Sequence, residues 1–238
     1  MTKSVRVGDF TPSLHGFTFG NAWPHIPLWQ LTIAGLRLPI GDAAAGLCGG
    51  MALSVADLNA YGIPAADIPR PAFGTAAYRY LVRRQVTSLG GILVPGRLLS
   101  LMRTSRPQRE SLLAESLGWF GSAFHSRSWI MANREWPRVR RELDGGRFAV
   151  VILVRVIGNN PLQMGRNHQV LAYGYDLDGS DLTLHVYDPN WPGDDDVTLR
   201  LDLADSRTVI ATTYSKPDPP VVCFFRTPYE PADPTPWR

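Results

Sequence analysis

The stretch from residue 46 to residue 58 reads Gly46-Leu47-Cys48-Gly49-Gly50-Met51-Ala52-Leu53-Ser54-Val55-Ala56-Asp57-Leu58. Met51, Val55 and Leu58 recur at spacings of four and three, which predicts one stripe of a buried helix. Cys48 would then lie in the first turn, where unpaired N–H groups and the helix dipole favour a thiolate. The two glycines after it lower helix propensity, which indicates close approach of another backbone or of a substrate. A small cysteine that only fills a tight packing point is the alternative interpretation.

The helix that begins here is predicted to end at Gly62, because Pro64 follows. Residues 65–146 are expected to be mostly helical. The pieces expected there are Thr75 to Leu89, Gly96 to Met102, Ser111 to Phe120, Ser126 to Asn133 and Glu135 to Leu143. Many arginines fall in this region, and solvated helix faces explain most of them; a patch for an acidic substrate is the minority interpretation.

From Phe148 the pattern changes to that of strands. Residues 149–154, Ala-Val-Val-Ile-Leu-Val, form a continuous apolar run that is typical of a strand buried on both faces. The further predicted strands are Asn167 to Tyr175, Asp181 to Asp188, Val197 to Leu201, Thr208 to Tyr214 and Val221 to Phe225. Helices followed by an antiparallel sheet define the α+β class. We expect one domain over residues 1–226 and a poorly ordered, Pro-rich tail over residues 227–238.

Composition narrows the function classes. The chain has 238 residues, 45% of them hydrophobic, and a net charge of +3, which is too small to indicate a nucleic-acid partner. No apolar run reaches transmembrane length, and the first residues lack the apolar core of a signal peptide. We therefore expect no membrane partner, and a cytoplasmic protein or one exported without a cleaved signal. Lys3 and Lys216 are the only lysines among many arginines, which suggests a GC-rich bacterial genome.

A nucleophilic cysteine needs a base, and the chain has five histidines. Two of them lie in predicted strands, and the alternation of side chains in those strands shows which one can face the core. His168 shares a strand face with Val170, Ala172 and Gly174, whereas His185 alternates away from the apolar face of its strand. Asp188 lies at the end of that apolar face, so it can orient the imidazole of His168. A core histidine and a turn aspartate before a proline are the alternatives. Cys223 lies among apolar residues and is expected to be inert.

The order of these features resembles the papain-like cysteine peptidase superfamily, nearest the bacterial branch of double-glycine bacteriocin-processing peptidases. The residues that carry the resemblance are Cys48 at a helix start, the Asn-His-Gln-Val-Leu-Ala-Tyr-Gly-Tyr-Asp strand from Asn167, and the Val-Tyr-Asp-Pro-Asn segment from Val186. They lie within residues 41–201. The resemblance implies a helical half with an insert at 65–146, a sheet half at 147–226, and a Cys48–His168–Asp188 triad in the cleft between them. It also implies a peptide or another acyl substrate and thioester chemistry.

One residue departs from the family pattern. The position six residues before the cysteine usually holds a Gln that donates to the oxyanion, and here it is Asp42, which accepts but does not donate. Asn21 is the candidate donor in its place, and a turn cap is its alternative role. Asn190 is a substitute for orienting His168 should Asp188 point away. The departure leaves open a catalytically inactive interaction module or a secreted effector as the alternative function.

The remaining motifs do not indicate a cofactor or a metal. The acidic segment from Asp188 to Asp196 resembles a calcium loop, but Pro192 and Leu199 stand where an EF-hand needs a ligand and a glutamate. We interpret it as an acidic turn. The histidines are scattered and the two cysteines far apart, which does not fit a zinc site. The specificity pocket is expected within the helical insert.

Overall fold

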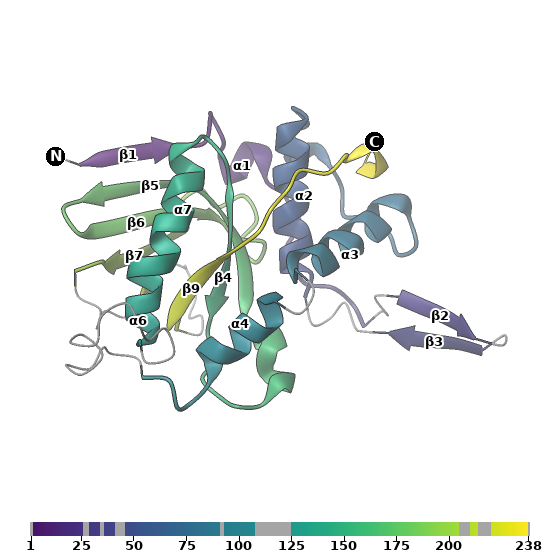
Figure 1. The fold of residues 1–238 in the computed structure, drawn as a ribbon. Helices are drawn as coiled ribbons and strands as arrows, with labels where there is room; N and C mark the ends of the chain where they lie inside the picture. The colour runs from purple at the N-terminus through teal and green to yellow at the C-terminus, as the bar shows by residue number, and fades with distance from the viewer. Residues whose placement is uncertain are drawn as a thin grey trace.

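The computed structural model describes residues 2–25, 29–33, 36–40, 46–90, 93–107, 125–204, 210–213 and 220–237. The α+β prediction is confirmed, because helices dominate the first part of the chain and an antiparallel sheet the second. Figure 1 shows the sheet on one side with α7 lying across it, and α2 and α3 on the other side. The β2–β3 hairpin projects away from both layers.

The helical elements are α1 (Pro12–His15), α2 (Cys48–Ala60), η2 (Ala65–Asp67), α3 (Ala76–Ser88), α4 (Leu93–Met102), α6 (Arg127–Ile130), η4 (Met131–Glu135), α7 (Trp136–Asp144), η5 (Pro161–Arg166) and η6 (Thr235–Trp237). The strands are β1 (Lys3–Arg6), β2 (Trp29–Ile33), β3 (Leu36–Ile40), β4 (Ala149–Val154), β5 (His168–Asp178), β6 (Asp181–Tyr187), β7 (Thr198–Asp202), β8 (Ala211–Thr212) and β9 (Cys223–Thr227).

The main sheet has seven strands in the order β8-β7-β6-β5-β4-β9, and β1 joins it beside β5. Strand β5 has 11 residues and is long enough for two neighbours on the same edge. Residues 168–172 pair with β4, and residues 174–177 pair with β1. Strand β1 therefore supplies hydrogen-bond partners for the part of β5 that extends beyond β4.

The predicted strands are present, with shifted ends. The predicted run from residue 149 to residue 154 coincides with β4 and is buried throughout. The strand expected over 167–175 continues to Asp178, because β1 supplies hydrogen-bond partners for its second half. Of the strand expected over 208–214, the described part forms only the short β8.

Helix α2 is the buried centre of the helical half. Every residue from Gly49 to Leu58 is buried, as expected for a helix that is apolar on all sides. A Cβ on Gly49 would overlap the side chains of Gln169 and Ser88, and a Cβ on Gly50 would overlap the carbonyl oxygen of Leu81. The glycines thus permit the close packing of α3 and β5 on α2, which is one of the two reasons expected for them.

The segment 65–146 is mostly helical in its described part, as predicted. α3 and α4 match two predicted helices, and α6, η4 and α7 follow one another without a break from residue 127 to residue 144. The helix expected over 111–120 lies outside the described residues. The arginines are not all solvated: Arg127 is 2% exposed, and its guanidinium donates to main-chain carbonyls such as that of Leu101 at the end of α4.

The expectation of a poorly ordered tail is wrong for residues 228–237. The Tyr229 hydroxyl and the Ala232 N–H donate to Asp57 Oδ1 over 3.1 and 2.9 Å. Trp237 lies against Phe17, with their ring centroids 5.0 Å apart. The physical reason is that Asp57 is fully buried on α2, and a buried carboxylate needs hydrogen-bond donors. Figure 1 shows this segment running from β9 across to α2 and α3.

In the part of the chain that the structure describes, we find no helix that combines the length and the apolar character needed to cross a membrane.

Candidate active site

Cys48 is the first residue of α2, as the sequence predicts. Leu47 precedes it as the N-cap and provides no side-chain cap, and the N–H of Gly50 in the first turn donates to Gln85 Oε1 on α3. The thiol is free and half-buried. The ring of His168 and the backbone N–H of Gln169 act on the thiol and favour its thiolate form. A cysteine with these two partners at a helix start differs from one that only fills core volume.

His168 is the first residue of β5 and is 4% exposed. Its Nε2 lies 2.6 Å from Asp188 Oδ1, which leaves Nδ1 as the ring nitrogen that faces Cys48. Asp188 follows directly on β6 and is fully buried. The three predicted residues are thus brought together, with the imidazole between the thiol and the carboxylate.

The charges of this group favour a thiolate and an imidazolium. Burial by itself raises the pKa of the Cys48 thiol, but the bond to His168, its positive charge and the Gln169 N–H outweigh it, so the pKa is lowered overall. Burial likewise lowers the pKa of His168, and the charge and hydrogen bond of Asp188, with a smaller contribution from Cys48, raise it to about 10. Each partner stabilises the charged form of the other.

The strand faces explain why His168 and Asp188 meet. A bulge in β5 shifts the register between Ala172 and Gly174. Before the bulge, Ala172 pairs with Val186, so the face of β5 that carries His168 is the same sheet face as that of Val186 in β6. Asp188 follows Val186 by two residues and lies on this face. Gly174 pairs with His185 on the opposite face, so the prediction that Gly174 shares a face with His168 is wrong. An extra residue in one strand reverses the alternation beyond it.

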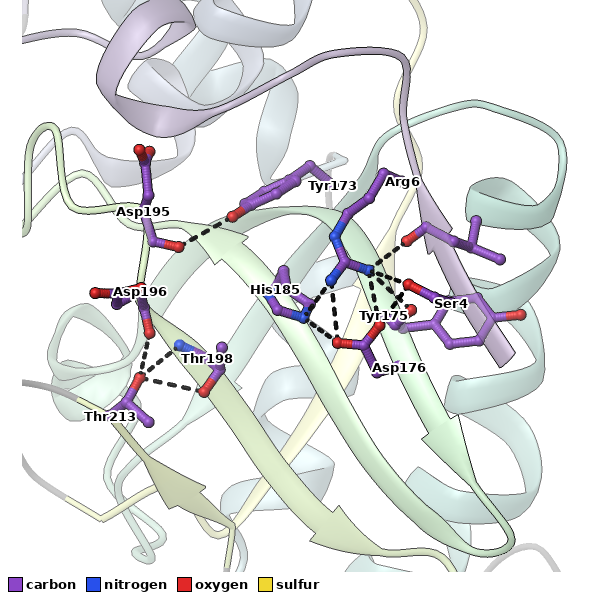
Figure 2. A network of polar contacts seen from close by, with 11 residues as sticks. Ser4, Arg6, Tyr173, Tyr175, Asp176, His185, Asp195, Asp196, Thr198 and Thr213 are labelled. Atoms are coloured by element: carbon purple, nitrogen blue, oxygen red, sulfur yellow. Dashed lines mark hydrogen bonds and ion pairs between the residues drawn. The ribbon is translucent and has the colours of Figure 1, made fainter. Parts of the chain in front are cut away.

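His185 belongs to a separate polar cluster, as predicted. Figure 2 shows its ring beside Arg6 and Asp176. The Nε2 atom lies 2.7 Å from Asp176 Oδ2 and 2.9 Å from Arg6 Nη2. Burial raises the pKa of Asp176, but the hydrogen bonds from Arg6, Ser4 and His185 hold it well below its usual range. This cluster joins β1 to β5 and β6, which is a structural role.

The acidic segment before β7 is also used within the fold. The carboxylate of Asp195 accepts the N–H and the hydroxyl of Ser13, and its backbone carbonyl accepts the Tyr173 hydroxyl (Figure 2). In the described ranges of the chain, no group of three or more His, Cys, Asp or Glu side chains is arranged to hold a metal ion.

Asn21 and Asn190 lie beside the triad. Asn21 Oδ1 accepts the Leu47 N–H over 2.6 Å, and its Nδ2 donates to Asn190 Oδ1 over 3.2 Å. The Asn190 N–H donates to Asp188 Oδ1 over 2.8 Å. Asp188 therefore does not point away from His168, and the substitute role of Asn190 is not needed. The role of Asn21 as an oxyanion donor stays a prediction, and Asp42 lies outside the described residues.

A cavity of about 290 Å³ opens beside Cys48 and His168. Its other walls are mostly apolar and come from the end of α3, from α4, from β4 and from the η5 segment; they include Val86, Leu89, Val94, Leu98, Ile152 and Met164. The cavity lies partly in the helical insert, where the specificity pocket was expected, and its Ile152 and Met164 side lies outside that insert. Val86 and Leu89, which line the cavity, are apolar side chains that are 40% and 38% exposed in the structure.

Two other features lie away from this site. Cys223 is fully buried in β9, and burial raises the pKa of its thiol to about 12, as expected of an inert cysteine. A larger cavity of about 430 Å³ is lined by Ala56, Arg147 and Arg226 among others, and by none of the predicted site residues.

Comparison of the chain with protein-family models, with curated proteins and with solved structures found no match.

Proposed function

We propose that this protein is a papain-like cysteine hydrolase or acyltransferase that attacks an amide or ester carbonyl. The observation that carries the proposal is the Cys48–His168–Asp188 arrangement, with the carboxylate oxygen 2.6 Å from the imidazole. A thiolate at a helix start, a base beside it and a group that orients the base are the parts that nucleophilic catalysis needs.

The reaction proceeds in two steps. The Cys48 thiolate adds to the carbonyl carbon, the bond to the leaving group breaks, and the His168 imidazolium gives its Nδ1 proton to the departing amine or alkoxide. A thioester remains on Cys48. In the second step neutral His168 takes a proton from water or from an acceptor amine, which attacks the thioester and releases the thiolate. The proton then on His168 restores the starting ion pair.

Both steps place a negative charge on the carbonyl oxygen, which needs hydrogen-bond donors. The backbone N–H of Cys48 at the start of α2 supplies one donor in this proposal. Asn21 is the candidate for the second, since its amide nitrogen lies against the loop before Cys48: a Cβ on Gly46 would be only 2.9 Å from Asn21 Nδ2. An amide nitrogen has two hydrogens, and the bond to Asn190 uses one of them.

The cavity beside Cys48 favours a substrate with an apolar group next to the reacting carbonyl. Its apolar walls would be buried by an aliphatic side chain of a peptide or by a short acyl chain, at about 25 cal/mol per Å² of apolar surface removed from water. The substrate of this proposal is therefore a peptide or other acyl compound with an aliphatic group.

The test is acylation by p-nitrophenyl hexanoate. The expected result is a burst of nitrophenolate and a mass increase of one hexanoyl group on a peptide that contains Cys48. Cys48→Ser should lose the burst and the adduct, and Cys223→Ser should keep both. An adduct that persists in Cys48→Ser would contradict the assignment.

The alternative is an inactive interaction module that keeps the fold, and Asp42 at the usual donor position favours it. It predicts a folded protein in which Cys48 reacts no faster than an ordinary thiol. Labelling with iodoacetamide across a range of pH separates the two. A thiol that reacts at pH values below the ordinary cysteine pKa supports the enzyme, and a thiol that does not supports the module.

A further inference from the structure

The polar contacts around the candidate site close into a ring. The Cys48 thiol interacts with the ring of His168, and His168 bonds to Asp188. Asp188 Oδ1 accepts the Asn190 N–H, the Asn190 side chain accepts from Asn21, and Asn21 accepts the N–H of the residue before Cys48. The covalent bond between residues 47 and 48 closes the circuit.

The orientation of the Asn21 amide follows from its partners. Its oxygen faces two N–H donors, the backbone of Leu47 at 2.6 Å and the indole of Trp23 at 3.2 Å. Neither of these groups can accept, so the amide oxygen must face them and the nitrogen must face Asn190. The Asn21–Asn190 bond is therefore a directed contact between a donor and an acceptor.

Asn21 is held from a second side as well. Its backbone N–H donates to the Pro189 carbonyl over 2.9 Å, so its backbone is attached to the loop after β6. Its side chain is attached to the loop before α2. One residue thus joins the loop that carries the nucleophile to the loop that carries the orienting carboxylate, although 26 residues separate it from Leu47 and 169 from Asn190.

We propose that Asn21 and Asn190 are positioning residues for the reaction proposed above, because they fix the loop before Cys48 relative to the Asp188 loop. The inference rests on the proposed function. The Asn190 N–H donates to the same Asp188 oxygen that binds His168, so a displacement of Asn190 changes the orientation of the carboxylate and then of the imidazole. In this role Asn190 touches neither the thiol nor the reacting atoms, and the positioning role of Asn21 is separate from its candidate role as an oxyanion donor.

The experiment measures the rate of Cys48 alkylation by iodoacetamide at about pH 6 relative to about pH 10, in about 0.15 M salt. The ratio reports the thiolate–imidazolium pair and cancels changes in access to the thiol. Cys48→Ser supplies the background from Cys223. The titratable groups that act on the thiol are His168 and Asp188, and every variant retains them.

Asn190→Ala removes the acceptor of the Asn21 bond, and Asn21→Ala removes its donor. Each should lower the ratio about threefold to tenfold, the range for one hydrogen bond that is partly exposed. The double variant should lose little more than either single one, since both break the same link. Asn190→Asp retains an acceptor oxygen at the same place and should restore most of the ratio. Asn133→Ala, on η4, is the distant control.

The outcomes separate this inference from the proposed function. A wild-type thiol that reacts only at pH values near the ordinary cysteine pKa would overturn the proposed function itself. A reactive wild-type thiol whose ratio is unchanged in Asn190→Ala would overturn the positioning role alone. Additive losses in the double variant would also overturn it. Because Asn190 is exposed, its variants should fold, so the result does not depend on the stability of Asn21→Ala.

Discussion

The pair formed by Cys48 and His168 determines how reactivity should depend on pH. Because the thiol pKa is lowered, the thiolate is present at pH values below the ordinary cysteine pKa of about 8.5. It is lost only as the pH falls through the lowered pKa. The His168 pKa is raised to about 10, so the imidazolium is lost as pH rises through that value. The two apparent values belong to the pair as a unit.

We therefore expect different pH profiles for acylation and for alkylation. Acylation by the hexanoyl ester, measured as the initial burst, should be bell-shaped, because this step needs both the thiolate and the His168 imidazolium. Alkylation needs only the thiolate and should stay high on the alkaline side. Stopped-flow measurement of the burst and iodoacetamide labelling over the same pH series check this, and an alkylation rate that rises only near the ordinary thiol pKa contradicts it.

The two strand histidines should respond differently to substitution. His168→Ala removes the base and the acid, and turnover should fall at least about 100-fold. His185→Ala should change turnover less than about threefold and cost about 1 kcal/mol of unfolding free energy, because its Nε2 donates to Asp176, and the Asp176 carboxylate pairs with Arg6 of β1. Steady-state kinetics and urea unfolding of both variants provide the measurement. Reversed kinetic effects would place the catalytic base on the other strand.

Elements could be predicted from the sequence where one local period decides them. The apolar run of β4 and the stripe of α2 are such cases, and the alternation within β5 and β6 correctly placed His168 with Asp188. The bulge at residues 172–174 could not be predicted, because it is a property of the pairing of two strands. The contact of Asn21 with Asn190 joins loops that are far apart in sequence, so no local pattern reports it.

The packing of α2 against its neighbours gives a prediction about its glycines. Gly49→Ala should destabilise the protein by about 1–3 kcal/mol, since the new methyl group overlaps Gln169 and Ser88. The intrinsic helix preference of alanine, about 1 kcal/mol, acts in the opposite direction. Urea unfolding monitored by tryptophan fluorescence measures the difference.

Gly96 in α4 is the matched control. A Cβ there meets nothing within 4 Å, so Gly96→Ala should leave stability unchanged or raise it by up to about 1 kcal/mol. Equal effects at the two positions would mean that helix propensity, and not the close approach of α3 and β5, decides the cost.

The molecule as a whole is held together by contacts between its most distant segments. Asp57 on α2 accepts hydrogen bonds from Arg84 and Tyr80 on α3, and from Tyr229 and Ala232 in the tail. The sequence showed proline-rich composition after Arg226 and suggested disorder. It could not show that a buried carboxylate on another element needs donors from this segment.

Tyr229→Phe tests that anchorage. Removing the hydroxyl takes away one bond to the buried Asp57 carboxylate and should lower the free energy of unfolding by about 1–2 kcal/mol. Tyr61→Phe is the control, because Tyr61 is 49% exposed and its ring lies largely in water. A loss of the same size in both variants would argue against a specific role of the tail.

The anchorage of the tail on Asp57 has a consequence for synthesis. The helix that begins at Cys48 is made early, but donors for its buried carboxylate come from residues 229 and 232. β9, which borders β4, begins only at Cys223. It follows that a ribosome must translate beyond residue 232 before α2 has all of its partners, so the nascent protein should carry an unreactive thiol until then. Ribosome-bound chains stalled before residue 223 should show Cys48 labelled no faster at about pH 6 than an ordinary thiol.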